Sequence, residues 1–306
     1  MARAQAVAQA RAVAHTRAVA LAQGAARARV VAPAAAVNAP AWLREINRYR
    51  LAAGLAAVTA QATWVTGIKD HLRYMAKSTA TYMTGPYASQ HTENPRSPYY
   101  TRLGATEAGA SDLFKGAVGF TRMNFITGWL SSPFHAIGML RPALRQVAFA
   151  SRSGTGDAGL DVISGLVAAA PDPAPVLFPG PGITTSLLTY SGSEMPNPLQ
   201  TCNWPGRHQY GLPLIALLPA PPAQHLTATL RPSAGGTEST GRGTICLVDE
   251  HSYHSTDPVY GAAGAKILAD DHAVVLIPLH PLRPGSYRVT IQQPGRPAIT
   301  WSFSAV

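Results

Sequence analysis

The sequence predicts an α+β domain followed by an all-β sandwich domain, and three observations carry this prediction. Apolar residues recur at helical spacing up to about residue 140. A glycine-rich turn then separates two alternating apolar runs within residues 144–166. Beyond five prolines between residues 171 and 181, the chain contains only short β-type runs separated by Gly, Pro and Ser.

The length and composition are consistent with two folded domains. The chain has 306 residues, which is longer than most domains built on a single hydrophobic core. Hydrophobic residues make up 46% of it. The formal net charge is +10, but the first 40 residues hold five arginines and no acidic residue. Because half of the excess charge lies there, and no basic stripe interleaved with aromatic residues follows, we expect no nucleic-acid partner.

Residues 1–39 form a tail rich in Ala and Arg. Its 18 alanines give it helix propensity, but Arg and Gln interrupt every apolar window. The alternatives are an export signal of unusual sequence, a disordered linker and an Ala-rich helix, and we favour export followed by a linker. No segment of the chain is apolar enough to predict a transmembrane helix.

Two amphipathic helices are predicted at the start of the first domain, which we place at residues 40–167. Trp42, Ile46 and Tyr49 stand at i, i+4 and i+7, and Gly54 ends this first helix. The second helix is predicted over about residues 60–79. Its apolar side carries Trp64, Ile68, Leu72 and Met75.

A long structured loop and a third helix follow. Residues 80–104 are rich in Gly, Pro, Tyr, Ser and Asn, and loops of this length in a compact domain are usually functional or disordered. A helix is expected over residues 117–131. Pro133 then interrupts or restarts the helix, leaving one or two turns before the predicted hairpin.

The second domain is predicted to begin after a Pro-rich hinge at residues 168–182. Within residues 183–306, six β-type runs fit an all-β sandwich of about immunoglobulin size. Cys202 and Cys246 are the only cysteines of the chain. They are either a disulfide, which we favour, or two buried thiols, depending on the redox compartment.

Five segments in order carry a family resemblance. They are LREINRYRLAAGL (43–55), DHLRYMAK (70–77), QHTENP (90–95), GATEAGASD (104–112) and GWLSSPFHAIGMLRPALRQVAFA (128–150). This set resembles the CAP superfamily, the SCP domain of cysteine-rich secretory, antigen 5 and pathogenesis-related proteins. The resemblance implies an α-β-α sandwich of a bacterial, secreted type. The chain's last segment, from residue 280, also resembles the final hairpin of bacterial Ig-like modules.

The resemblance also implies a cleft with two histidines and two acidic residues that can bind a divalent metal such as zinc. His91 matches the first histidine and His135 the second. The two acidic positions fall on Ser111 and Ser132, which weakens the expected metal affinity. Glu93 or Asp112 would have to supply a carboxylate to such a metal site.

Other residues are assigned to the cleft by the same resemblance. His71 and Tyr74 match the family's histidine and tyrosine on the second helix, so we expect them to line the cleft together with Ser111 and Asp112. An alternative is that the histidines are structural and only hold the loop to the helix.

Catalytic candidates are His91, His135, Ser132 and Glu93. Ser132 and His135 are spaced i, i+3, but no nucleophile elbow surrounds Ser132, which is better explained as a helix cap before Pro133. We therefore predict a secreted or envelope-associated protein that binds a lipid, a glycan or a protein surface in this cleft. A metal-dependent or serine-type hydrolase and a structural or adhesive protein are the alternatives.

Overall fold

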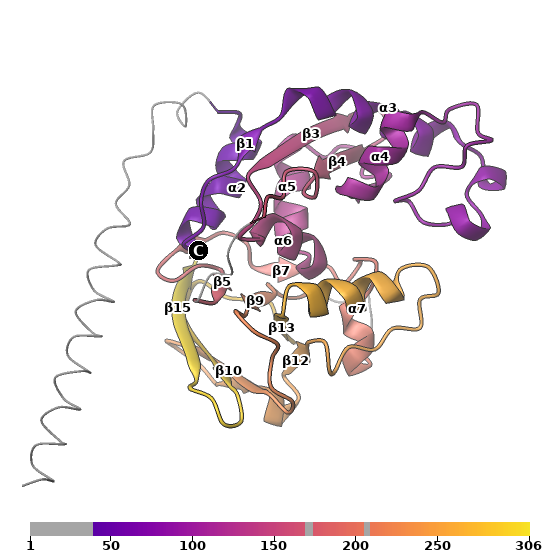
Figure 1. The fold of residues 1–306 in the computed structure, drawn as a ribbon. Helices are drawn as coiled ribbons and strands as arrows, with labels where there is room; N and C mark the ends of the chain where they lie inside the picture. The colour runs from indigo at the N-terminus through magenta and orange to yellow at the C-terminus, as the bar shows by residue number, and fades with distance from the viewer. Residues whose placement is uncertain (1–38, 169–173, 205–208) are drawn as a thin grey trace, which may run out of the picture. The chain divides into compact units, whose positions relative to one another are not determined.

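The computed structural model describes residues 39–168, 174–204 and 209–306 (Figure 1). The predicted export signal or linker therefore lies outside the described residues, apart from Ala39. Residues 169–173 of the predicted hinge also lie outside them. We call residues 41–167 the N-terminal part and residues 174–306 the C-terminal part. Residues 41–306 form one compact unit.

The N-terminal part is built from helices and one four-stranded sheet. The helices are α2 (Ala41–Ala52), α3 (Val65–Lys77), α4 (Arg102–Ala110), α5 (Arg122–Leu130) and α6 (Pro133–Leu140). The strands are β1 (Thr59–Ala60), β2 (Ser111–Phe114), β3 (Gln146–Arg152) and β4 (Asp157–Asp161). Their order in the sheet is β1-β3-β4-β2, with β1 parallel to β3 and the other pairs antiparallel.

Helices cover both faces of this sheet, because side chains of β3 alternate between the faces. Ala148 and Ala150 pack against the apolar side of α3. Phe149 lies between them and points the other way, with its ring 5.5 Å from Trp42 of α2 and 6.2 Å from Trp129 of α5. These buried side chains hold the sheet between two helical layers.

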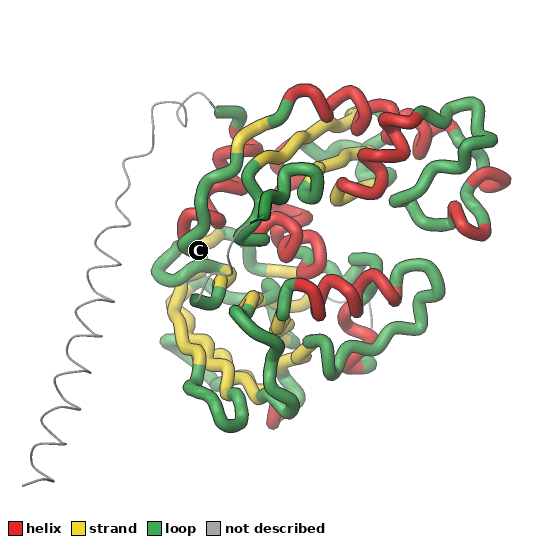
Figure 2. Tube along the Cα trace, in the orientation of Figure 1, coloured by secondary structure: helices red, strands yellow, loops and turns green. Residues whose placement is uncertain are grey.

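The structure adds an unpredicted helix and strand to the first domain. Helix α4 and strand β2 follow the long loop directly, and this loop contains only short helical turns (Figure 2). Gly104 of α4 has to be small, because a Cβ there would lie 2.5 Å from Oε1 of Glu93. The third helix begins at Arg122 rather than at 117, because Thr121 and Asn124 form a capping box.

Arg50 of α2 is fully buried and has a structural role. Its guanidinium donates hydrogen bonds to the carbonyls of Ala56, Met139, Arg141 and Leu144. Burial lowers the pKa of Arg50 to about 10. The arginine thus ties α2 to the end of α6, which carries His135.

The C-terminal part contains two larger sheets and a two-stranded one. The five-stranded sheet runs β11 (Glu238–Ser239), β10 (Thr227–Pro232), β14 (Gly285–Gln292), β15 (Ile299–Ala305) and β6 (Thr184–Thr185). The four-stranded sheet runs β12 (Ile245–Val248), β13 (Ala273–Pro278), β9 (Leu214–Leu217) and β5 (Val176–Phe178). The small sheet pairs β7 (Thr189–Tyr190) with β8 (Tyr210–Gly211).

The six predicted β runs correspond to strands of the two larger sheets. Strand β5 falls inside the predicted hinge and pairs with β9. Helix α7 (Gly261–Asp270) lies between β12 and β13, where an all-β domain was expected. The predicted disulfide between Cys202 and Cys246 is confirmed, with their Cα atoms 5.8 Å apart.

The two parts contact one another along several elements. The hydroxyls of Tyr49 and Thr185 are 2.7 Å apart, so α2 meets the C-terminal part at β6. Arg141, just after α6, makes a bidentate ion pair with Asp271 at 2.9 and 3.0 Å. Helix α6 is therefore held in place by both parts, and it lies next to the pocket described below.

Candidate functional site: a pocket between the two parts

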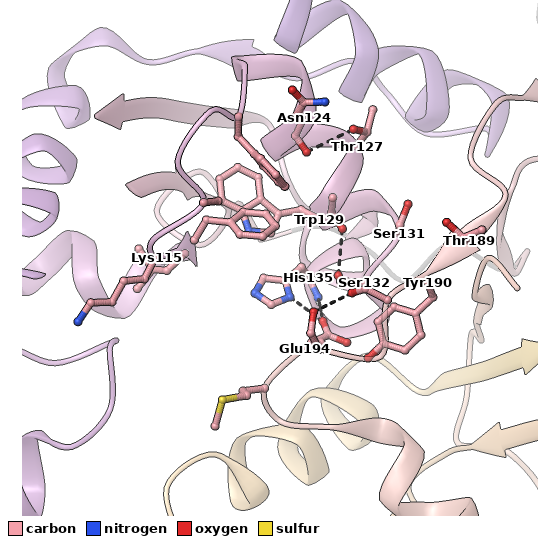
Figure 3. A pocket seen from close by; sticks show the side chains of 18 of the residues that line it. Lys115, Asn124, Thr127, Trp129, Ser131, Ser132, His135, Thr189, Tyr190 and Glu194 are labelled. Carbon is pink, nitrogen blue, oxygen red and sulfur yellow. Dashed lines mark hydrogen bonds and ion pairs between the residues drawn. The ribbon is translucent and has the colours of Figure 1, made fainter. Parts of the chain in front are cut away.

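One pocket of about 730 Å³ lies between the N-terminal and C-terminal parts. Residues 90–91 and several residues between 113 and 135 line one wall, and residues between 186 and 195 line the other together with Tyr260. Both His91 and His135 line it, although they are 44 positions apart in the sequence. The fold thus brings the loop histidine and the helix histidine to one site, and Figure 3 shows His135 in it.

His135 is held by a carboxylate from the C-terminal part. Oε1 of Glu194 lies 2.6 Å from Nδ1 of His135 and accepts a second hydrogen bond from its backbone N–H at 3.0 Å. Burial alone would lower the pKa of His135, but the charge of Asp112 and the bond to Glu194 outweigh it and raise this pKa. Glu194 thereby fixes the ring orientation and favours the imidazolium form.

The ring of His91 is hydrogen-bonded to the backbone. Its Nδ1 donates to the carbonyl of Ala108 at 3.1 Å, so Nε2 of the neutral ring is an acceptor. Burial lowers the pKa of His91 to about 4, and the charge of His135 acts in the same direction. Tyr260 packs its ring edge-on at 6.2 Å and accepts a hydrogen bond from the N–H of Gln90 at 2.8 Å. The two pocket histidines therefore favour opposite protonation states.

Glu93 lies beside His71 rather than beside His91. Its Oε1 is 2.9 Å from Nδ1 of His71, and its Oε2 accepts the N–H of Thr101 at 3.1 Å. The other ring nitrogen of His71 is 2.9 Å from the carbonyl of Gln90. His71 and Glu93 are both buried, and together they anchor the long loop to α3 and α4.

Tyr74, Ser111 and Asp112 are buried. None of them, nor His71, is among the residues that line the pocket in the described part of the chain. Tyr74 accepts a hydrogen bond from the N–H of Asn94 at 2.9 Å and so supports the loop. Burial raises the pKa of Asp112 to about 7, while the charge of His135 lowers it.

Ser132 is bound to the backbone of the preceding helix. Its Oγ donates to the carbonyl of Gly128 at 2.9 Å, and the residue stands at the N-cap position of α6 before Pro133. Figure 3 shows this bond and, separately, the bond between His135 and Glu194. Among the described residues, no hydrogen bond joins Ser132 to His135.

The described residues offer a metal ion an incomplete set of ligands. In the described ranges, no group of three or more His, Cys, Asp or Glu side chains could hold a metal ion. Nδ1 of His135 bonds Glu194 and Nδ1 of His91 donates to a carbonyl, so a metal could bind these rings only through Nε2. Serines occupy both positions where a carboxylate was expected, and Glu93 is used by His71.

The C-terminal wall of the pocket was not predicted from the sequence. Glu194 stands alone in the polar stretch SGSEMPNP, and Tyr260 precedes a helix that the β pattern did not indicate. An isolated acidic residue 59 positions after a histidine gives no local signal. The Pro-rich boundary pointed instead to two separate domains.

A match to a family model identifies most of the N-terminal part. Residues 43–163 match the model of the cysteine-rich secretory protein family, CAP. The predicted CAP domain is therefore confirmed over these residues. No curated protein and no solved structure gave a significant match.

No helix in the described ranges is long and apolar enough to cross a membrane.

Proposed function

We propose that this CAP-domain protein binds a ligand in the pocket between its two parts, and that it acts outside the cytoplasm or in the cell envelope. The observation that carries the proposal is the pair of imidazoles on one pocket wall, with His135 held by Glu194 from the opposite part. A volume of about 730 Å³ lies within the range of small-ligand pockets, about 300–1,000 Å³.

The disulfide supports export, because such bonds persist mainly in oxidising compartments. CAP proteins are often secreted, and this agrees with the proposal. The two larger sheets support the proposed kinship of the C-terminal part with bacterial Ig-like modules, with α7 as an addition. In this proposal the C-terminal part does more than space or anchor the CAP domain, since it supplies one wall of the pocket.

Acid–base catalysis is a second candidate function, and one observation favours it. The pKa values of His91 and His135 are shifted in opposite directions within one pocket, an arrangement that suits a base and an acid. Ser132 is a poor nucleophile here, because its hydroxyl bonds the carbonyl of Gly128. Water would have to be the nucleophile, activated by the acceptor nitrogen of His91.

A pocket-filling variant tests the binding proposal. Ser131 lines the pocket and is half-buried, so Ser131→Phe would occupy part of its volume. Ser302 on β15 is exposed, and Ser302→Phe is the matched control. Calorimetric titration with fatty acids, oligosaccharides and peptides should find a ligand whose affinity falls at least about tenfold in Ser131→Phe only. If every bound ligand is indifferent to Ser131→Phe, the pocket is not the binding site.

A further inference from the structure

The pocket wall presents hydrogen-bonding groups that the protein leaves unused. Oδ1 of Asn124 accepts from the N–H and hydroxyl of Thr121 at 2.9 and 2.7 Å, which orients the amide. Its Nδ2 has no partner among the described residues. The same holds for the hydroxyls of Ser131 and Thr189, which Figure 3 shows on the pocket wall. The wall thus offers one oriented amide donor and two hydroxyls.

An aromatic surface lies beside these polar groups. The ring of Phe114 is 5.9 Å from that of Phe120 and 5.2 Å from that of Trp129, and all three side chains line the pocket. Phe120 is 44% exposed, so one ring of this cluster is open to a ligand. Rings fixed by such mutual packing form a rigid apolar platform.

The pocket carries little charge that a ligand could use. Among the lining residues that the structure describes, Lys115 is exposed, and Glu194 is the one carboxylate. Oε1 of Glu194 is already bonded to His135, and Oε2 is buried. A polyanion would therefore meet one exposed lysine and the partly buried ring of His135.

The combination of these groups selects a ligand class. A fatty acyl chain would bury the amide and the hydroxyls without partners, at about 1–3 kcal/mol each. A sugar ring instead presents hydroxyls along its edge and C–H groups on its faces, which suit the polar wall and the aromatic platform. We propose that the pocket binds a short neutral glycan, an inference that rests on the proposed function and deepens it.

Calorimetric titration with maltotriose, cellotriose and triacetylchitotriose, after a screen on an array of neutral glycans, tests this inference. Palmitate and a tripeptide represent the competing ligand classes. We expect at least one neutral glycan to bind. Its affinity should fall about tenfold or more in Phe120→Ala and in the double variant Ser131→Ala/Thr189→Val. Thr229→Val, at an exposed position on β10, is the matched control and should leave the affinity unchanged.

The outcomes separate this inference from the binding proposal. If palmitate or the tripeptide binds, Ser131→Phe blocks it and no neutral glycan binds, the pocket function stands and the glycan inference is wrong. Glycan binding that ignores Phe120→Ala and the double variant also overturns the inference. If no compound of any class binds in a way that Ser131→Phe blocks, both proposals fail.

Discussion

Two histidine–glutamate pairs in this protein have the same chemistry and different surroundings. His71 and Glu93 are 2.9 Å apart, and their side chains are 1% and 0% exposed. His135 and Glu194 are 2.6 Å apart, but the side chain of His135 remains 16% exposed at the pocket. The first pair is buried inside the N-terminal part, whereas the second joins two parts of the chain and leaves its ring partly exposed at the pocket. The two pairs therefore differ in the burial of the imidazole and not in the chemistry of its partner.

The largest effect is expected at the buried pair. His71→Ala leaves the carboxylate of Glu93 buried without its histidine, which should lower the free energy of unfolding by about 3–5 kcal/mol. Urea unfolding followed by circular dichroism measures this change. His254→Ala removes an exposed histidine and should stay within about 0.5 kcal/mol of the unmodified protein. A similar loss in both variants would show that the buried histidine contributes no more to stability than an exposed one.

Glu194→Ala should lower the unfolding free energy less than His71→Ala does, and it should lower ligand affinity. The N–H and Nδ1 of His135 lose their acceptor beside a pocket, so we expect a loss of about 1–3 kcal/mol in unfolding free energy. Ligand affinity should fall at least about tenfold while the variant stays folded. Asp270→Ala, which breaks a surface pair with Lys266, is the control and should leave affinity unchanged. If Glu194→Ala unfolds at the same denaturant concentration and binds normally, the second pair has no role.

A buried carboxyl without a histidine gives a third case. Burial beside Asp161 raises the pKa of Glu107 to about 8. Because the unfolded state releases this proton at lower pH, stability from Glu107 is present below about pH 4.5 and is lost as the pH rises through 8. Between pH 5 and pH 8, the unfolding free energy of the unmodified protein should therefore fall by on the order of 2 kcal/mol more than that of Glu107→Gln.

Denaturant titrations at several pH values measure the slope in Glu107→Gln, with Glu45→Gln on α2 as the control. An unchanged slope in Glu107→Gln would show that this carboxyl is ionised in the folded protein. Glu107 would then not differ in charge from Glu93 and Glu194, which both have a histidine within hydrogen-bonding distance.

Ser132→Ala should have the smallest effect. The hydroxyl makes one half-buried hydrogen bond to the carbonyl of Gly128, so the expected loss is about 1 kcal/mol or less. Ligand binding should persist, and so should any hydrolytic activity found in a substrate screen. Complete loss of such an activity, with the fold intact by circular dichroism, would assign Ser132 a nucleophilic role that this geometry does not support.

Much of the fold could be predicted from local patterns in the sequence. The spacing of Trp42, Ile46 and Tyr49 predicted α2, and the alternating runs predicted the hairpin of β3 and β4. Helix α4 was missed because its many small residues give almost no amphipathic signal. Helix α7 was missed for a related reason, since Gly and Ala make up six of its ten residues.

The site was predictable only in its CAP half. Motif order indicated His91 and His135, and both line the pocket. Glu93 is two residues from His91 in sequence, yet the loop turns its carboxylate towards His71. Glu194 reaches His135 only because the C-terminal part packs against α6, and no local pattern encodes that contact.

The most direct test of the account is a nuclear magnetic resonance titration of the histidine rings in the unmodified protein and in Glu194→Gln. Asp112 and Glu194 raise the pKa of His135 against the effect of its burial. We therefore predict that this pKa lies above 6.5 in the unmodified protein and falls in Glu194→Gln. An unchanged titration of His135 in Glu194→Gln would contradict the claim that the C-terminal part holds this ring at the pocket.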